Sequence, residues 1–359
     1  MAAVQGTSVA HCRSSDGGYS FAVVGDRPTV QGYVLMNLMC ESVNVCVIGS
    51  QLVRPECVLA TRSGALYTAD WRGGVAQVLP DGTENLFTGT MPDGLTARPN
   101  GIALMADGNF LMAQLGETDG GVYRLTRDGQ ITPWLRQVNG MELPPTNYVV
   151  QDAAGRTWIT VSTRLTPRAA AYRGDVADGF IVCVDANGHA SIVAEGLGYT
   201  NEVAVHPSGR WLYVNETFGR RLSRFELRAN GALGARETVT EFGPGTFPDG
   251  LAFDEEGAAW IVSIVSNRLI RVAPDGSQRM HLEDNEPEHL SWVEEAFVSH
   301  TMGRPHLDGI RSERLRNISS IAFAGPERRT GVLGCLLGNH LETLPMPVAG
   351  VAPFHWNFS

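Results

Sequence analysis

A repeat of about fifty residues is the feature that most constrains how this chain can fold. Five segments each open with a short apolar stretch, pass through a polar turn that contains glycine, and continue with an aromatic or β-branched stretch. The turn glycines are Gly64, Gly108, Gly155, Gly209 and Gly257, at spacings of 44, 47, 54 and 48 residues. A weaker sixth copy starts at Ser319. A period of this length indicates one supersecondary unit that is used again and again.

Each unit continues with a third apolar stretch and a second turn. The second turns pair an Asp or Asn with Gly: Asp81-Gly82, Asp128-Gly129, Asn187-Gly188, Asn230-Gly231 and Asp275-Gly276. Such pairs tolerate the positive φ angles of tight hairpins, and the stretches between them are rich in strand-forming residues. Four-stranded units at this period are typical of propeller blades. We therefore predict an all-β fold, a six-bladed β-propeller of four-stranded antiparallel blades.

The ends of the chain define the expected domain. The sixth unit has room for three strands, at about 319–323, 330–336 and 340–345. A fourth strand at 43–48 would close that blade, so that both ends of the propeller meet in one sheet; without it the preceding strand would be left with an exposed edge. The propeller is therefore expected to span residues 43–359. Residues 1–42 contain no repeat and are expected to form a flexible N-terminal extension.

Charge and missing motifs exclude several functions. The 28 basic and 38 acidic residues leave a net charge of −10, which argues against nucleic-acid and membrane partners. Every basic residue is arginine, so Schiff-base chemistry and a phosphate-binding P-loop, which need a lysine, are absent. Neither GxSxG nor a GxGxxG that leads into a helix occurs. The N-terminal residues do not read as a signal peptide, so we expect a cytoplasmic protein.

The residue that opens each repeat carries a side-chain oxygen. These residues are Glu56, Asn100, Asn147, Asn201, Asp249 and Ser319. The innermost strand of every blade begins near the central channel, so equivalent residues should surround one axis. Two close carboxylates repel each other, and a divalent cation would balance their charge of −2. An all-oxygen set suits calcium first, then magnesium or manganese, and disfavours a structural zinc site.

These residues resemble the metal-site pattern of the senescence marker protein (regucalcin)/gluconolactonase/luciferin-regenerating enzyme family. The resemblance rests on Arg54-Pro55-Glu56, Asn147, Asn201 and Pro248-Asp249-Gly250-Leu251 and covers the chain from Arg54 onward. It implies a six-bladed propeller with one divalent cation in the central channel, for which we expect Ca²⁺ first and Mg²⁺, Mn²⁺ or Zn²⁺ as alternatives. Its protein ligands would be Glu56, Asn147, Asn201 and Asp249, with Asn100 as an additional polar residue beside them. Sugar-lactonase members often carry an arginine two residues before the third-blade asparagine, where this chain has Pro145.

Two long segments are expected to rim the metal site. Residues 163–178, which include Arg164, are expected to cover the site as a lid. Residues 284–317 include His300 and His306. Long loops in a compact fold often carry function. Both histidines are candidates for proton transfer, because no ring position is a histidine. Arg164 and Glu216, the latter at the end of a second strand, are candidates for substrate contact.

The resemblance and the oxygen ring together favour a metal-dependent hydrolase of a lactone or related cyclic ester. The cation would act as a Lewis acid, water would be the nucleophile, and Asp249 would accept its proton, the role that the resemblance implies in some members. In other relatives the matching carboxylate is thought to attack directly. Two alternatives stay open: a metal-stabilised ligand-binding propeller without turnover, and an aryl-ester or organophosphate hydrolase. The expected partner is a small-molecule substrate, which the sequence does not name, and the sequence leaves the oligomeric state open.

Overall fold

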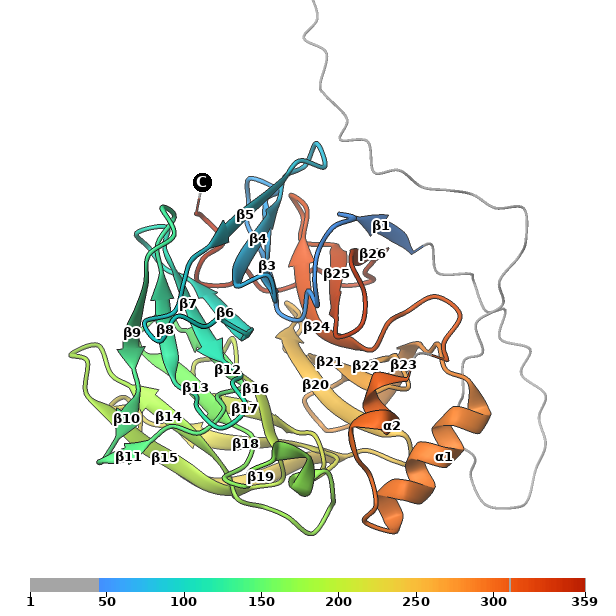
Figure 1. Ribbon diagram of the computed structural model, residues 1–359. Helices are drawn as coiled ribbons and strands as arrows, with labels where there is room; N and C mark the ends of the chain where they lie inside the picture. The colour runs from blue at the N-terminus through green and yellow to red at the C-terminus, as the bar shows by residue number, and fades with distance from the viewer. Residues whose placement is uncertain (1–44, 310, 359) are drawn as a thin grey trace, which may run out of the picture.

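The computed structural model describes residues 45–309 and 311–358, and these residues form six four-stranded sheets around one axis (Figure 1). The predicted six-bladed propeller is therefore confirmed. The expected extension at 1–42 lies outside the described residues. Within the described ranges, no helix combines the length and the apolar character that a membrane span needs.

The first three blades follow each other along the chain. Blade one comprises β2 (Val58–Ala60), β3 (Leu66–Asp70), β4 (Gly74–Val78) and β5 (Glu84–Thr88). Blade two comprises β6 (Pro99–Leu104), β7 (Phe110–Gln114), β8 (Val122–Leu125) and β9 (Ile131–Leu135). Blade three comprises β12 (Tyr148–Gln151), β13 (Thr157–Val161), β14 (Gly179–Val184) and β15 (Ala190–Leu197). Between blades two and three lies a small hairpin that the repeat did not predict, β10 (Gln137–Val138) and β11 (Met141–Glu142).

The last three blades complete the circle. Blade four comprises β16 (Thr200–Val205), β17 (Trp211–Glu216), β18 (Arg221–Leu227) and β19 (Leu233–Glu241). Blade five comprises β20 (Thr246–Phe253), β21 (Ala259–Val265), β22 (Arg268–Val272) and β23 (Gln278–Leu282). Blade six comprises β24 (Ile318–Ala324), β25 (Thr330–Cys335), β26 (Leu341–Pro345) and, from the other end of the chain, β1 (Cys46–Ile48).

Closure of the propeller occurs in blade six. Strand β1 pairs antiparallel with β26, with Cys46 opposite Thr343 and Ile48 opposite Leu341. This confirms the prediction that a strand from before the first repeat completes the last sheet. The innermost strands β2, β6, β12, β16, β20 and β24 each contact the next, and β24 contacts β2. Their starts therefore surround a single channel.

A repeated turn explains why the blades form at these places in the sequence. In blade three, Asp152 accepts hydrogen bonds from the backbone N–H of Ala154 and Arg156 and from Nε1 of the fully buried Trp158 (2.9, 3.0 and 2.8 Å). In blade five, Asp254 bonds in the same way to Trp260, at 2.9 Å. One carboxylate thus closes a hairpin and orients a tryptophan between neighbouring blades, where the apolar core lies.

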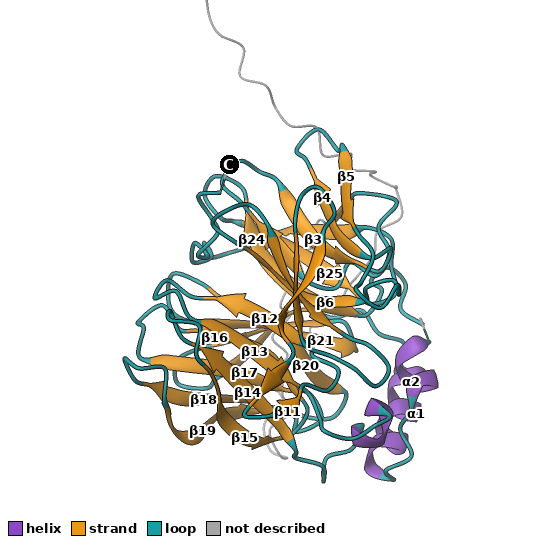
Figure 2. Ribbon diagram, turned by 60° about the vertical axis from the view of Figure 1, so that its left-hand side comes forward, coloured by secondary structure: helices purple, strands orange, loops and turns teal. Residues whose placement is uncertain are grey.

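The segment 284–317 was expected to be a loop, but it contains two helices, α1 (Pro287–Val298) and α2 (Arg304–Asp308), which lie on one side of the sheets (Figure 2). Helix α1 begins where the Glu286 carboxylate accepts the N–H groups of Glu288 and His289. Phe297 of α1 packs edge-on against Phe247 at the start of β20, with ring centroids 5.4 Å apart. This contact fixes the insertion over the end of blade five at which β20 begins.

Candidate functional site

Five of the six repeat-opening side chains meet in a buried ring at the start of the innermost strands. Glu56, Asn100, Asn147, Asn201 and Asp249 are each only 2–6% exposed. Asn100 Nδ2 donates to the carbonyl oxygen of Asn147 at 3.0 Å, and Asn147 Nδ2 donates to Asn201 Oδ1 at 2.6 Å. The amides therefore hold one another in place. We call these five residues the ring.

Glycines next to the ring let the strands approach closely. A Cβ atom at Gly101 would lie 2.6 Å from the Cα of Tyr148, and one at Gly250 would lie 2.6 Å from the Cα of Ser320. Any side chain at these two positions would push neighbouring blades apart. The sixth repeat position, Ser319, donates its hydroxyl to the Glu56 carbonyl at 3.2 Å and so ties blade six to blade one.

The two ring carboxylates are under electrostatic strain. Asp249 Oδ1 and Glu56 Oε2 are buried without a hydrogen-bond partner in the described part of the chain, although Arg54 Nη2 lies 3.0 Å from Glu56 Oε2. Burial raises the pKa of Asp249 well above its usual value, and repulsion from Glu56 and Glu202 raises it further. The guanidinium groups of Arg54 and Arg168 oppose that rise. Unsatisfied buried carboxylates of this kind are costly unless a cation matches them.

The ring fits a hard divalent cation. Asp249 Oδ1, which has no partner among the described residues, Glu56 Oε2, which contacts only Arg54, and the neighbouring amide oxygens form an all-oxygen donor set. Across residues 45–309 and 311–358, no cluster of three or more His, Cys, Asp or Glu side chains is arranged to bind a metal. A cation at this position would therefore depend on Glu56 and Asp249 together with the asparagine oxygens, as the sequence predicts.

One buried acid near the ring was not predicted. Glu202 follows Asn201, is 5% exposed and accepts the N–H of Leu251 at 2.8 Å. Burial raises the pKa of the Glu202 carboxyl to about 8, while hydrogen bonds from Leu251 and Ser320 oppose the rise. The repeat could have revealed Glu202, because it is the carboxylate at the position after the opening residue. The equivalent residues in the other blades are Cys57, Gly101, Tyr148, Gly250 and Ser320.

Two arginines reach the ring from outside it. Arg54 Nη2 also lies 3.4 Å from Asn100 Oδ1, and its guanidinium lies over the Trp71 ring, 4.3 Å from the centroid. Arg168, from the expected lid, donates to Asn147 Oδ1 at 3.1 Å and lies over the ring of Tyr199. Position 145, where sugar-lactonase members often carry arginine, is proline here, so the positive charge at the ring comes from other loops.

The predicted contact residues Arg164 and Glu216 are held by other partners. Arg164 donates to the carbonyl of Asp178 at 2.6 Å and pairs with Glu195 at 2.5 Å. Glu216 is fully buried, and both of its oxygens accept hydrogen bonds from Arg221, at 2.8 and 2.7 Å. These contacts close the lid segment and brace blade four, and neither side chain is joined to the ring by a hydrogen bond or ion pair within the described residues.

The two histidine candidates lie in the rim. His300, just after α1, faces Arg173 and Asp175 of the lid segment, at 3.3 and 3.8 Å, and is 43% exposed at its side chain. His306 of α2 stacks on Trp292, with centroids 4.0 Å apart. In the described part of the chain, no hydrogen bond or ion pair connects either histidine to a ring residue. The structure therefore joins the two expected rim segments to each other, but it does not bring these imidazoles to the ring.

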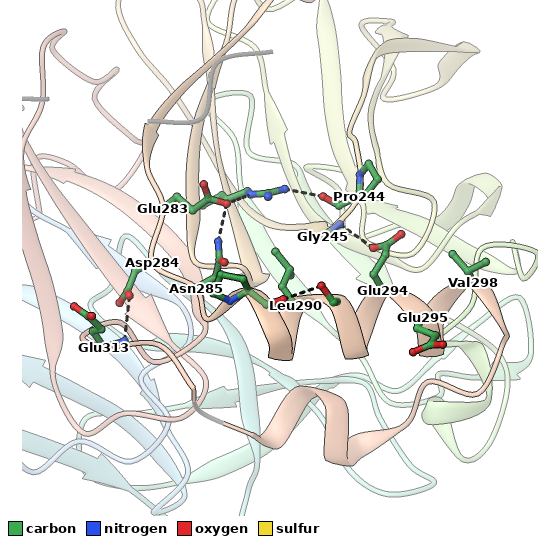
Figure 3. A pocket seen from close by; sticks show the side chains of 13 residues that line it. Pro244, Gly245, Glu283, Asp284, Asn285, Leu290, Glu294, Glu295, Val298 and Glu313 are labelled. Carbon is green, nitrogen blue, oxygen red and sulfur yellow. Dashed lines mark hydrogen bonds and ion pairs between the residues drawn. The ribbon is translucent and has the colours of Figure 1, made fainter. Parts of the chain in front are cut away.

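The two larger cavities found among the described residues lie on the face at which the innermost strands begin. One, of about 500 Å³, has Arg54 and Trp71 in its wall together with residues of α2. The other, of about 950 Å³, lies between α1 and blade five and is lined by Glu283, Glu294 and other acidic side chains (Figure 3). Of the two, only the smaller shares a residue, Arg54, with the surroundings of the ring.

Comparison with known proteins gives consistent matches. Residues 54–286 match the model of the SMP-30/Gluconolactonase/LRE-like region. A 6-deoxy-6-sulfogluconolactonase from Pseudomonas putida is 31% identical over 235 residues, which cover 64% of this chain and 75% of that protein. Among solved structures, a gluconolactonase from Xanthomonas campestris is 20% identical with a TM-score of 0.62, over 85% of this chain and 90% of that one. The calcium-binding protein regucalcin from Agrobacterium tumefaciens is 18% identical with a TM-score of 0.61, over 85% of this chain and 96% of that one.

Proposed function

Since the chain belongs to the SMP-30/gluconolactonase/LRE-like family, we propose that it is a lactone hydrolase whose active site is the ring. The single observation that carries this proposal is the pair of buried carboxylates, Glu56 and Asp249, whose outer oxygens have no hydrogen-bond partner among the described residues. The Pseudomonas putida relative is named for 6-deoxy-6-sulfogluconolactone, so lactones of sugar acids are the first substrates to test.

A divalent cation fits this ring, with calcium the first choice because one structural relative is described as calcium-binding. Glu56, Asn147, Asn201 and Asp249 would hold it. When bound, it would supply Lewis-acid polarisation of the lactone carbonyl and positive charge for the oxyanion that forms there.

The side chains of the ring divide the remaining work. The Asp249 carboxylate is the acceptor for the proton of the attacking water, whose oxygen bonds to the carbonyl carbon. The C–O bond that closes the lactone then breaks. The leaving alkoxide takes the proton from Asp249, which yields the open hydroxy acid. Asn100 positions Asn147 through its Nδ2 hydrogen bond. His300 and His306 have no part in this scheme, because their contacts hold them in the rim.

The experiment is a panel of aldonolactones assayed by proton release, with the protein as purified, after chelation and after calcium is restored. Turnover that disappears on chelation and returns with calcium supports the proposal. Binding of the lactones without turnover would favour the metal-stabilised binding propeller. Faster cleavage of aryl esters or phosphotriesters in a parallel panel would move the protein to the neighbouring class of hydrolase.

A further inference from the structure

The cavity of about 500 Å³ beside the ring has an unusual charge for this chain. Its charged lining consists of Arg54, Arg304 and Arg316 with a single carboxylate, Asp308. The whole protein carries a net charge of −10. A cationic cavity on an acidic protein concentrates anions of small size and disfavours cations. Its volume lies in the range of about 300–1,000 Å³ that is usual for small-molecule sites.

Two of the three guanidinium groups form ion pairs within the chain, Arg54 with Glu56 at 3.0 Å and Arg304 with Asp308. Arg316 donates from Nη1 to the backbone carbonyls of Ser312 and Leu315, at 3.2 and 3.3 Å, and has no carboxylate partner in the described ranges. Arg304 pairs with Asp308, yet its side chain is 53% exposed. The buried Nε of Arg54 has no hydrogen-bond partner among the described residues. Each arginine therefore keeps N–H donors for a ligand.

Arg54 connects this cavity to the ring. Its Nη2 contacts Glu56 Oε2 and Asn100 Oδ1, while its guanidinium stacks on Trp71 in the cavity wall. A divalent cation would match the charge of −2 on Glu56 and Asp249, which leaves the positive charge of Arg54 without a counter-charge. A molecule could place its carbonyl oxygen at the ring, where the cation would bind it, and a negatively charged group in the cavity, where Arg54 would pair with it.

We propose that this cavity is a subsite for an anionic substituent, in which Arg54, Arg304 and Arg316 bind a sulfonate or carboxylate group of the substrate lactone. The proposal rests on the lactone hydrolase function and names the substrate class. Guanidinium groups form strong, directional hydrogen bonds with sulfonate and carboxylate oxygens. A neutral hydroxyl at the same position would bind less well, because it could not match the positive charge of the cavity.

The test compares three aldonolactones that differ at carbon six, with a hydroxyl, a carboxylate or a sulfonate there. We expect kcat/KM to favour a charged lactone over the hydroxyl form, and the arm with the higher value identifies which anion the subsite takes. In Arg304→Gln and Arg316→Gln this preference should fall about tenfold to a hundredfold, as expected for one lost charged hydrogen bond. Arg279→Gln, an exposed charge on β23 that lies outside the cavity lining, is the matched control and should keep the preference.

Direct binding separates the subsite from the catalytic proposal. Calorimetry with the open-chain 6-sulfonated or 6-carboxylated acid, on the calcium-loaded protein, reports the subsite without turnover. If no lactone is hydrolysed but the acid binds in an Arg304-dependent manner, the hydrolase proposal fails and the subsite stands. If all three lactones are hydrolysed equally by the wild type and by a folded Arg304→Gln/Arg316→Gln variant, the subsite is overturned and the hydrolase stands. Thermal melting of each variant confirms that it is folded.

Discussion

The two larger cavities at the end of the propeller where the innermost strands begin differ in how their charges are used. The acidic cavity under α1 is lined by five carboxylates and one arginine, Arg268. Several of its acids already have partners: Glu294 pairs with Arg220 at 2.6 Å and accepts the N–H of Gly245 at 2.8 Å, and Asp284 accepts the N–H groups of Glu313 and Leu315 at 3.1 and 2.6 Å. These charges fasten the insertion to blades four and five.

The arginine cavity under α2 shows the opposite arrangement. It is smaller, about 500 Å³ against 950 Å³, yet its guanidinium groups keep free donors and one of them contacts the ring. Volume therefore does not identify the substrate site in this protein. We propose the arginine cavity as part of that site, because it contacts the ring through Arg54 and because N–H groups without a partner gain free energy when an anionic ligand binds.

The strongest test of this contrast removes one carboxylate from the ring, which the arginine cavity contacts, and one from the acidic cavity. Asp249→Asn in the ring should lower kcat for lactone hydrolysis by about 10²–10⁴-fold, because the water loses its proton acceptor. It should also weaken calcium binding, since one of two negative charges is gone. Glu295→Gln, an exposed carboxylate of the acidic cavity, should change neither. Steady-state kinetics and metal analysis measure both variants, and equal activity of the two would place the chemistry outside the ring.

Replacing Arg54 tests the link between the ring and the arginine cavity. In Arg54→Gln, Glu56 loses its cationic neighbour, so the calcium-free protein should melt at a lower temperature. Calcium should then bind about tenfold more tightly, because a positive charge near the cation has been removed. Calorimetric titration with calcium measures this effect. Weaker calcium binding in a folded variant would contradict the geometry proposed for the ring.

Replacing Glu294 tests the structural role of the acidic cavity. Glu294→Gln removes the ion pair with Arg220, which is 13% exposed, and weakens the attachment of α1. We expect a loss of roughly 1 kcal/mol in the free energy of unfolding. The kcat/KM for the neutral lactone should stay as in the wild type. A large fall in kcat/KM without a change in melting temperature would mean that this cavity takes part in the reaction.

The smallest expected effect is that of salt. Raising sodium chloride from low to high concentration should increase KM for a charged lactone roughly twofold to threefold, because the arginine cavity attracts it through screened charge. KM for the neutral lactone should not change. A parallel rise for both substrates would indicate a general effect of salt on the protein rather than on the cavity.

The repeat predicted the six blades and the proximity of the ring side chains, whereas it said nothing about the structure of the rim. The repeat places six side-chain oxygens around one axis, because equivalent positions of a propeller lie near its channel, and the family resemblance selects Glu56, Asn147, Asn201 and Asp249 from them as predicted ligands. The insertion that carries α1 and α2 occurs once, so no comparison with a second copy could reveal its helices. His300 and His306 were reasonable candidates by residue type, yet packing of α1 on Phe247 and of Trp292 on His306 holds them in the rim.

The sequence by itself therefore determined the six blades and the residues that begin their innermost strands. Turn residues and alternating apolar positions specify each hairpin and its register over a few residues. Because the pattern repeats, the oxygen-bearing residue that opens each repeat comes to lie around one channel when the six blades close. The tertiary structure alone decided what surrounds that ring. Arg54, Trp71, Arg304 and Arg316 come from widely separated parts of the chain. They meet because the insertion packs onto blade five, and a contact between such distant residues leaves no periodic trace in the sequence.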